Sequence, residues 1–226
     1  MAQSAPRPLA HLGPLQQLRA GKLALRLPLL VVGLVGFGAS CALLIKAGLG
    51  ALGWDVLTLG LMEITGLSYG VLTIATSFVV LLFWLPLKEM PGLGTLANAV
   101  LVGLSADIAM DLIPDPTGVL AQWVYLAVGI LAFSFFDALY LGAQFGSGPR
   151  DGLMTGLVRV TGRPVWLVRT VLEVTVVAAG IAMGGHFGVG TLLIAFSVGP
   201  LIGWFLPYVT VPLTPRPRPS SGVGTT

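Results

Sequence analysis

Charged residues are scarce in this chain. Only 9% of the 226 residues are charged, whereas 55% are hydrophobic and the mean hydropathy is +0.93. An ordinary soluble domain carries about 25% charged residues, so the composition excludes that class. The apolar runs are unbroken and lack the alternation typical of membrane strands, which excludes a transmembrane barrel. The sequence therefore predicts an all-α integral membrane protein in contact with a lipid bilayer.

Cysteine and histidine are nearly absent as well. Cys41 is the single cysteine, which excludes an intramolecular disulfide and a cysteine-based metal cluster. The two histidines, His11 and His186, lie outside the apolar runs. The chain has neither a His-Glu-x-x-His zinc motif nor the Gly- and Lys-containing loop that binds ATP phosphates. We therefore expect no metal, no cofactor, no ATP-driven transport and no enzymatic activity.

The net charge of +3 arises from basic residues that flank the apolar runs instead of forming a patch. This distribution is typical of membrane topology and does not favour a nucleic-acid partner. A bilayer core of about 30 Å needs about 20 helical residues. Runs of this length cover residues 28–46, 68–87, 94–112, 119–142, 164–184 and 190–209. We predict six transmembrane helices between a basic leader, residues 1–27, and a disordered tail, residues 212–226.

Two shorter segments, residues 55–65 and 151–161, are each about half as long as a spanning helix. Each begins with an aspartate, Asp55 or Asp151, whose carboxylate is expected to cap the first amides of a helix. Each ends at Thr-Gly, and glycine is common just beyond a helix end. Glycine-rich limbs precede both segments. We predict re-entrant half-helices that start near the bilayer middle, with amphipathic surface helices as the alternative.

The chain also matches itself at a shift of 96 residues. Residues 50–103 and 146–199 are identical at 15 of 54 positions without a gap, against about five expected from composition. The identities include both aspartates, both Thr-Gly pairs and the Gly-Thr-Leu blocks at residues 94 and 190. We predict two membrane repeats, residues 28–115 and 116–211. Each contains a long helix, a glycine-rich limb, a short helix and two more long helices.

The positions of lysine and arginine predict that the second repeat is inverted relative to the first. If each half-helix returns to the face from which it enters, most basic residues are cytoplasmic and only Lys46 lies outside. Both chain termini are then cytoplasmic. The residues assigned to the inner face are Arg7, Arg19, Lys22, Arg26, Lys88, Arg159, Arg163, Arg216 and Arg218.

Ionisable residues in the half-helices and spans are the candidate solute-binding groups. Arg169 and Glu173 lie four residues apart on one helical face, where they can form an ion pair. A role in solute binding is one interpretation and a structural bridge is the other. Asp107 and Asp137 lie near the ends of their runs and are expected to be solvated or to cap helices. The predicted substrate-binding residues are Asp55, Asp151, Arg150, Arg169 and Glu173.

The blocks "GLGALGWDVLTLGLMEITGLSYG" and "FGSGPRDGLMTGLVRVTGRPV", followed by "GGHFGVGT" and "SVGPLIG", resemble the YczE/YitT-like bacterial integral membrane proteins. The resemblance covers residues 28–210. It implies a multi-spanning protein of the bacterial cytoplasmic membrane and assigns no catalytic or binding residue. From the architecture we expect a secondary transporter or facilitator of an unknown small solute. The alternative is a membrane scaffold or accessory protein, whose small-residue helix faces contact another protein or form a homo-oligomer.

Overall fold

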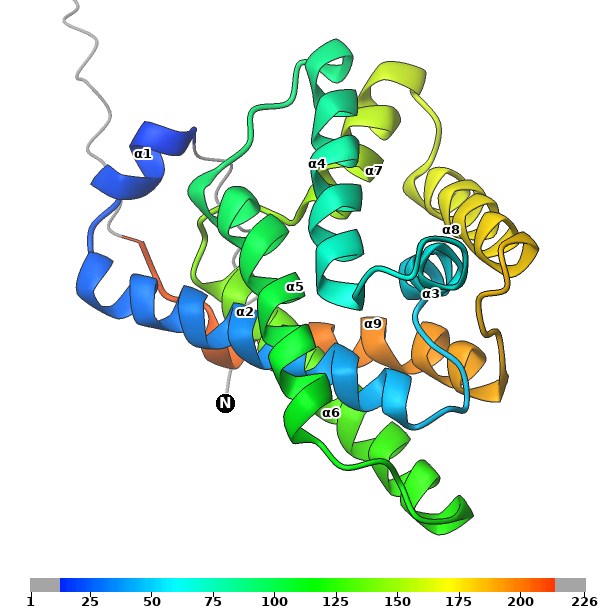
Figure 1. Ribbon diagram of the computed structural model, residues 1–226. Coiled ribbons are helices and arrows are strands. Elements are labelled where there is room, and N and C mark those ends of the chain that lie inside the picture. The colour runs from blue at the N-terminus through cyan, green and yellow to red at the C-terminus, as the bar shows by residue number, and fades with distance from the viewer. Residues whose placement is uncertain (1–12, 214–226) are drawn as a thin grey trace, which may run out of the picture.

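The computed structural model describes residues 13–213 (Figure 1), and within this range the chain is helical and contains no strand. The predicted all-α class is confirmed. The helices are α1 (Pro14–Arg19), α2 (Leu23–Lys46), α3 (Gly53–Thr65), α4 (Tyr69–Leu87), α5 (Leu93–Leu112), α6 (Val119–Gly142), α7 (Pro149–Thr161), α8 (Val165–Ala182) and α9 (Val189–Val209). We refer to α2–α5 as the first half and to α6–α9 as the second half.

Six of these helices, α2, α4, α5, α6, α8 and α9, are long and apolar enough to cross a membrane. They correspond to the six predicted runs. The two short helices, α3 and α7, have 13 residues each and correspond to the predicted half-helices. The predicted positions of Arg7 in the leader and of residues 214–226 in the tail lie outside the described residues.

The start of the first spanning helix differs from the prediction, because α2 begins at Leu23 and takes in Arg26 from the predicted leader. Arg26 is fully buried. Its guanidinium donates hydrogen bonds of 2.8 Å to the carbonyls of Gln17, Ala143 and Gln144. These partners offset the cost of burying the charge. Arg26 therefore fastens the N-terminal segment to the end of α6.

Helix packing joins the two halves. Helix α2 packs against α5 and α6, and α6 packs against α9. Each short helix lies beside a long helix of the other half, α3 beside α8 and α4 beside α7 (Figure 1). Aromatic rings fill the contact between α2 and α6, with the Phe37 centroid 4.5 Å from Phe133 and 6.0 Å from Tyr140. Each of the three buried hydrophobic clusters contains residues of both halves, so the core is shared between them.

The glycine-rich limbs, residues 47–52 and 143–148, each bind the start of a long helix in the other half. Leu49 O accepts a hydrogen bond of 2.7 Å from Gly190 N, and Phe145 O accepts one of 2.9 Å from Gly94 N. Both the donors and the acceptors are separated by 96 positions. Gly50 has a φ of 119°, and a β-carbon there would lie 2.6 Å from the Thr191 hydroxyl. Only glycine suits that backbone angle and that close approach.

Candidate solute-binding cavity

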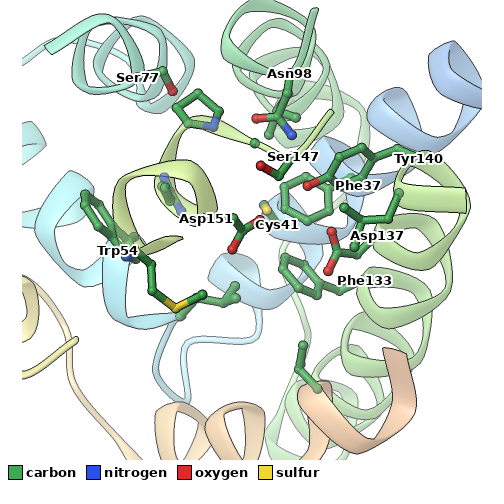
Figure 2. Close-up of a pocket in the computed structure, with 18 of the residues that line it drawn as sticks. Phe37, Cys41, Trp54, Ser77, Asn98, Phe133, Asp137, Tyr140, Ser147 and Asp151 are labelled. Atoms are coloured by element: carbon green, nitrogen blue, oxygen red, sulfur yellow. The ribbon is translucent and has the colours of Figure 1, made fainter. Parts of the chain in front are cut away.

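A cavity of about 410 Å³ lies where the two halves meet, within the range of about 300–1,000 Å³ typical of small-molecule sites. It is bordered by the start of α7, by the limb before it, and by residues of the long helices of both halves (Figure 2). Its polar lining consists of Tyr69, Thr73, Ser77, Asn98, Asp137, Tyr140, Ser147, Arg150, Asp151, Arg169 and Glu173.

The starts of the short helices differ in detail from the prediction. Asp55 and Asp151 occupy the third helical position, so the prediction that their carboxylates cap the helices is wrong. The capping positions are held by Leu52 and Gly148, and neither makes a side-chain cap hydrogen bond. In α7 the helix starts earlier because Pro149, which has no amide hydrogen, suits the first helical position. Both carboxylates still lie in the first turn, at the positive end of the helix dipole.

Asp55 and Arg150 form an ion pair that joins the two short helices. Arg150 Nη1 lies 3.3 Å from Asp55 Oδ1, and the side chains are 26% and 1% exposed. The guanidinium also lies 5.3 Å from the centroid of the Trp54 ring. Arg150 and Trp54 border the cavity, whereas Asp55 does not. The pair is thus a buried bridge between the halves, and Asp55 sits behind the cavity wall.

Asp151 and Asp137 both point into the cavity (Figure 2). Asp137, which the sequence predicts to be solvated or to cap a helix, has a half-buried side chain that lines the cavity. It lies within electrostatic range of Asp151 and Arg169. The place of Asp137 near the end of an apolar run predicts a surface position. The N-terminal segment covers that end of α6 through the contacts of Arg26, and this contact between distant segments leaves no local sequence signal.

Arg169 and Glu173 line the same cavity from α8, but they do not form the predicted ion pair. Ion pairs within residues 13–213 join Lys46 to Asp115, Arg150 to Asp55 and Arg159 to Glu89. The Glu173 carboxylate instead packs against Gly53 of α3, where a β-carbon would collide with it. Glu173 therefore belongs to the contact between α8 and the short helix of the other half.

Asp107 has the capping role that the sequence predicted. Its carboxylate accepts hydrogen bonds of 2.6 Å from Ser68 Oγ and from Gly70 N at the start of α4. A side chain of α5 thus accepts hydrogen bonds from the N-cap hydroxyl and from one of the first amides of α4. Asp107 does not line the cavity. No cluster of three or more His, Cys, Asp or Glu side chains is placed to hold a metal ion in the described part of the chain.

Six spanning helices around a polar central cavity define a multi-spanning integral membrane protein. Residues 24–207 match a family of unknown function, DUF6198, and the chain belongs to this family. An uncharacterized protein of Haemophilus influenzae is 37% identical over 169 residues, which cover 75% of this chain and 78% of the relative. The uncharacterized membrane protein YczE of Bacillus subtilis is 31% identical over 189 residues, covering 82% and 87%.

A further relative, the uncharacterized protein YyaS of Bacillus subtilis, is 26% identical over 182 residues, covering 79% of this chain and 90% of the relative. The resemblance to YczE stated from the sequence is confirmed. No solved structure matches the chain. These relatives establish the family and the membrane class, and none of their names gives a substrate or a reaction.

Proposed function

We propose that the protein is a secondary transporter or facilitator that carries a small solute across the bacterial cytoplasmic membrane. The observation that supports this function is the central cavity, which has the volume of a small-molecule site and is lined by both halves. Ionisable side chains are costly inside a bilayer and usually mark a solute or ion path. The proposed solute site comprises Asp151, Arg150, Arg169 and Glu173 from the sequence prediction, together with Asp137.

We also propose that the halves are inverted repeats related by a two-fold axis in the membrane plane. Residues near such an axis contact their own equivalents. Phe37 and Phe133 are 96 positions apart and lie 4.5 Å from each other. Trp54 and Arg150 have the same spacing and are stacked at 5.3 Å. These two contacts support an axis through the cavity, which is where inverted-repeat transporters bind their solutes.

A second cavity of about 410 Å³ suggests a route from the cavity to one face of the membrane. It shares Leu141 and Ser147 with the central cavity and is also lined by Lys88. Trp84 borders the second cavity and donates a hydrogen bond of 3.1 Å to the carbonyl of Pro149, which borders the first. In the proposed orientation Lys88 is cytoplasmic. The second cavity is then an inner vestibule, and the Trp84–Pro149 contact separates it from the solute site.

Access to Ser147 tests this function without knowledge of the solute. A single cysteine is introduced as Ser147→Cys in a Cys41→Ala background and exposed to a membrane-impermeant thiol reagent in right-side-out and inside-out vesicles. A transporter or facilitator exposes this position to both faces, so both preparations should label. Lys88→Cys and Asp111→Cys, at exposed positions, serve as one-sided controls that should label from opposite faces.

Labelling of Ser147→Cys from one face only would contradict a path through the molecule. That result would favour the alternative function, a membrane scaffold or accessory protein. In that case Asp151→Asn and Glu173→Gln should leave cellular function intact, whereas a transporter should lose it at unchanged membrane abundance.

A further inference from the structure

The charges at the central cavity are unbalanced. Its aspartate, glutamate and arginine residues are Asp137, Asp151, Glu173, Arg150 and Arg169. The charge of Arg150 is compensated by Asp55, which lies 3.3 Å away and outside the cavity lining. Three carboxylates then face a single remaining guanidinium, that of Arg169. The residues predicted from the sequence did not include Asp137, which adds a negative charge to the cavity.

Aromatic rings lie beside two of these carboxylates. Phe37, Phe133 and Tyr140 line the cavity next to Asp137, and their rings pack at centroid distances of 4.5 and 6.0 Å (Figure 2). A ring face attracts a cation through its quadrupole, and the attraction strengthens when water is displaced. Carboxylates combined with aromatic rings are the chemistry that recognises organic ammonium ions, whereas a small inorganic cation requires a cage of oxygen ligands.

The lining of this cavity also includes an unsatisfied buried polar group. Thr73 lines the cavity and is 3% exposed, and its Oγ has no hydrogen-bond partner among residues 13–213. A buried hydroxyl without a partner is unfavourable, so a ligand with a polar group near Thr73 would supply the missing bond. A volume of about 410 Å³ leaves room for a ligand larger than a bare ion.

We propose that the solute of the central cavity is a small organic cation carrying an ammonium group and a hydroxyl or similar polar group. This inference rests on the proposed function, since it names the class of solute for the same site. The ammonium group lies between Asp137 and Asp151 against the aromatic rings, and the polar end reaches the side of α4 that carries Thr73. Arg169 and Glu173 line the cavity from α8.

Three probes of nearly equal shape and different charge test the proposal. They are choline, its neutral carbon analogue 3,3-dimethylbutan-1-ol, and the anion 3,3-dimethylbutanoate, each titrated into purified protein in maltoside detergent at matched ionic strength. The readout is the apparent melting temperature, because a ligand that binds the folded state raises it by mass action. Choline should raise it in a saturable manner, and the other two probes should not.

Variants assign the binding to the cavity. Asp137→Asn should weaken the choline effect by about tenfold, which corresponds to about 1.4 kcal/mol. Asp137→Glu keeps the charge and should retain most of the affinity. Asp111→Asn is the matched control, because Asp111 is exposed at the end of α5 and outside the cavity, and it should bind like the unmodified protein. Melting temperatures without probe show whether each variant folds.

The outcomes separate this inference from the proposed function. Stronger stabilisation by the alcohol or the acid than by choline would overturn the cation assignment, while a cavity that binds solute would remain. Equal choline binding by Asp137→Asn and the unmodified protein would overturn the assigned position of the ammonium group. If no probe stabilises the protein, the cation inference is wrong. Two-sided labelling of Ser147→Cys still decides the transport function in each case.

Discussion

The two halves of the molecule share an order of helices and differ at the contact between their last two. Helices α4 and α5 pack closely, and a β-carbon at Gly103 would lie 2.6 Å from the carbonyl of Gly70. Helices α8 and α9 make almost no contact. The positions 96 residues after Gly70 and Gly103 hold Trp166 and Gly199. Trp166 is 68% exposed, and a β-carbon added at Gly199 would have no atom of residues 13–213 within 4 Å. Since Gly199 lines the cavity, the second half is open toward the site where the first is closed.

The halves also differ in the residues that they bring to the site. All the aspartate, glutamate and arginine side chains of the cavity lining belong to the second half. The first half carries Cys41, Trp54, Thr73 and Ser77 at positions equivalent to Asp137, Arg150, Arg169 and Glu173. The comparison teaches that a repeated framework does not imply a repeated site. The first half is the better packed frame, and the second half carries the charge.

The largest effect on stability is expected at the bridge between the halves. Arg150→Met leaves the Asp55 carboxylate buried without its partner, which costs about 3–5 kcal/mol of unfolding free energy. Asp55→Leu added to this variant should restore part of the loss. Arg169→Met makes the same change at an exposed side chain of the same half and should cost much less. Unfolding in detergent measures all three. Equal losses for the two arginine variants would contradict a special role for the bridge.

A smaller effect is expected at the equivalent glycines Gly103 and Gly199. Gly103→Ala forces a methyl group against the Gly70 carbonyl and should cost about 1–3 kcal/mol through separation of α4 and α5. Gly199→Ala meets no atom and should change stability by less than about 0.5 kcal/mol. The same unfolding measurement compares the pair. A loss at Gly199 as large as that at Gly103 would show that α8 and α9 are packed together in the membrane.

The smallest effect is expected at the C-terminal end of α7. Arg159 and Glu89 form an ion pair of 3.2 Å with side chains 53% and 25% exposed. The positions 96 residues away from these two hold Glu63 and Gly185, so the pair is not repeated. Glu89→Gln should cost less than about 1 kcal/mol, because solvent screens the pair and Arg159 keeps its bond to the Leu87 carbonyl. The loss should shrink further at high salt. A larger, salt-independent loss would place this pair among the contacts that define the fold.

The long helices and the half-helices follow from local features of the sequence. Length and continuous hydropathy define the six spans, and both Thr-Gly pairs mark real helix ends, where Gly66 and Gly162 have φ values of 70° and 64°. Left-handed backbone of this kind is set by the glycine itself and needs no distant partner. Hydropathy, run length and the Thr-Gly pairs therefore predict the helices without knowledge of how the two halves pack.

The parts of the site that could not be predicted depend on contacts between distant segments. The burial of Arg26 results from its bonds to Gln17, Ala143 and Gln144, and Asp137 lines a cavity that forms only where the two halves meet. The distribution of charge changes when Arg150 pairs with Asp55, 95 positions away, and Glu173 packs against α3 instead of binding Arg169. A helical spacing of four residues permits an ion pair, but tertiary packing decides which partner is used.

The accessible faces of Leu67 and Arg163 test the central claim of two inverted repeats most directly. Both side chains are exposed, each follows a half-helix, and they are 96 positions apart. Single cysteines placed there by Leu67→Cys and Arg163→Cys, in the Cys41→Ala background, are treated with an impermeant thiol reagent in intact cells and in inverted vesicles. Inverted repeats require that Leu67→Cys labels from outside and Arg163→Cys from the cytoplasmic face. Labelling of both from the same face would contradict the inverted arrangement and the solute site between the halves.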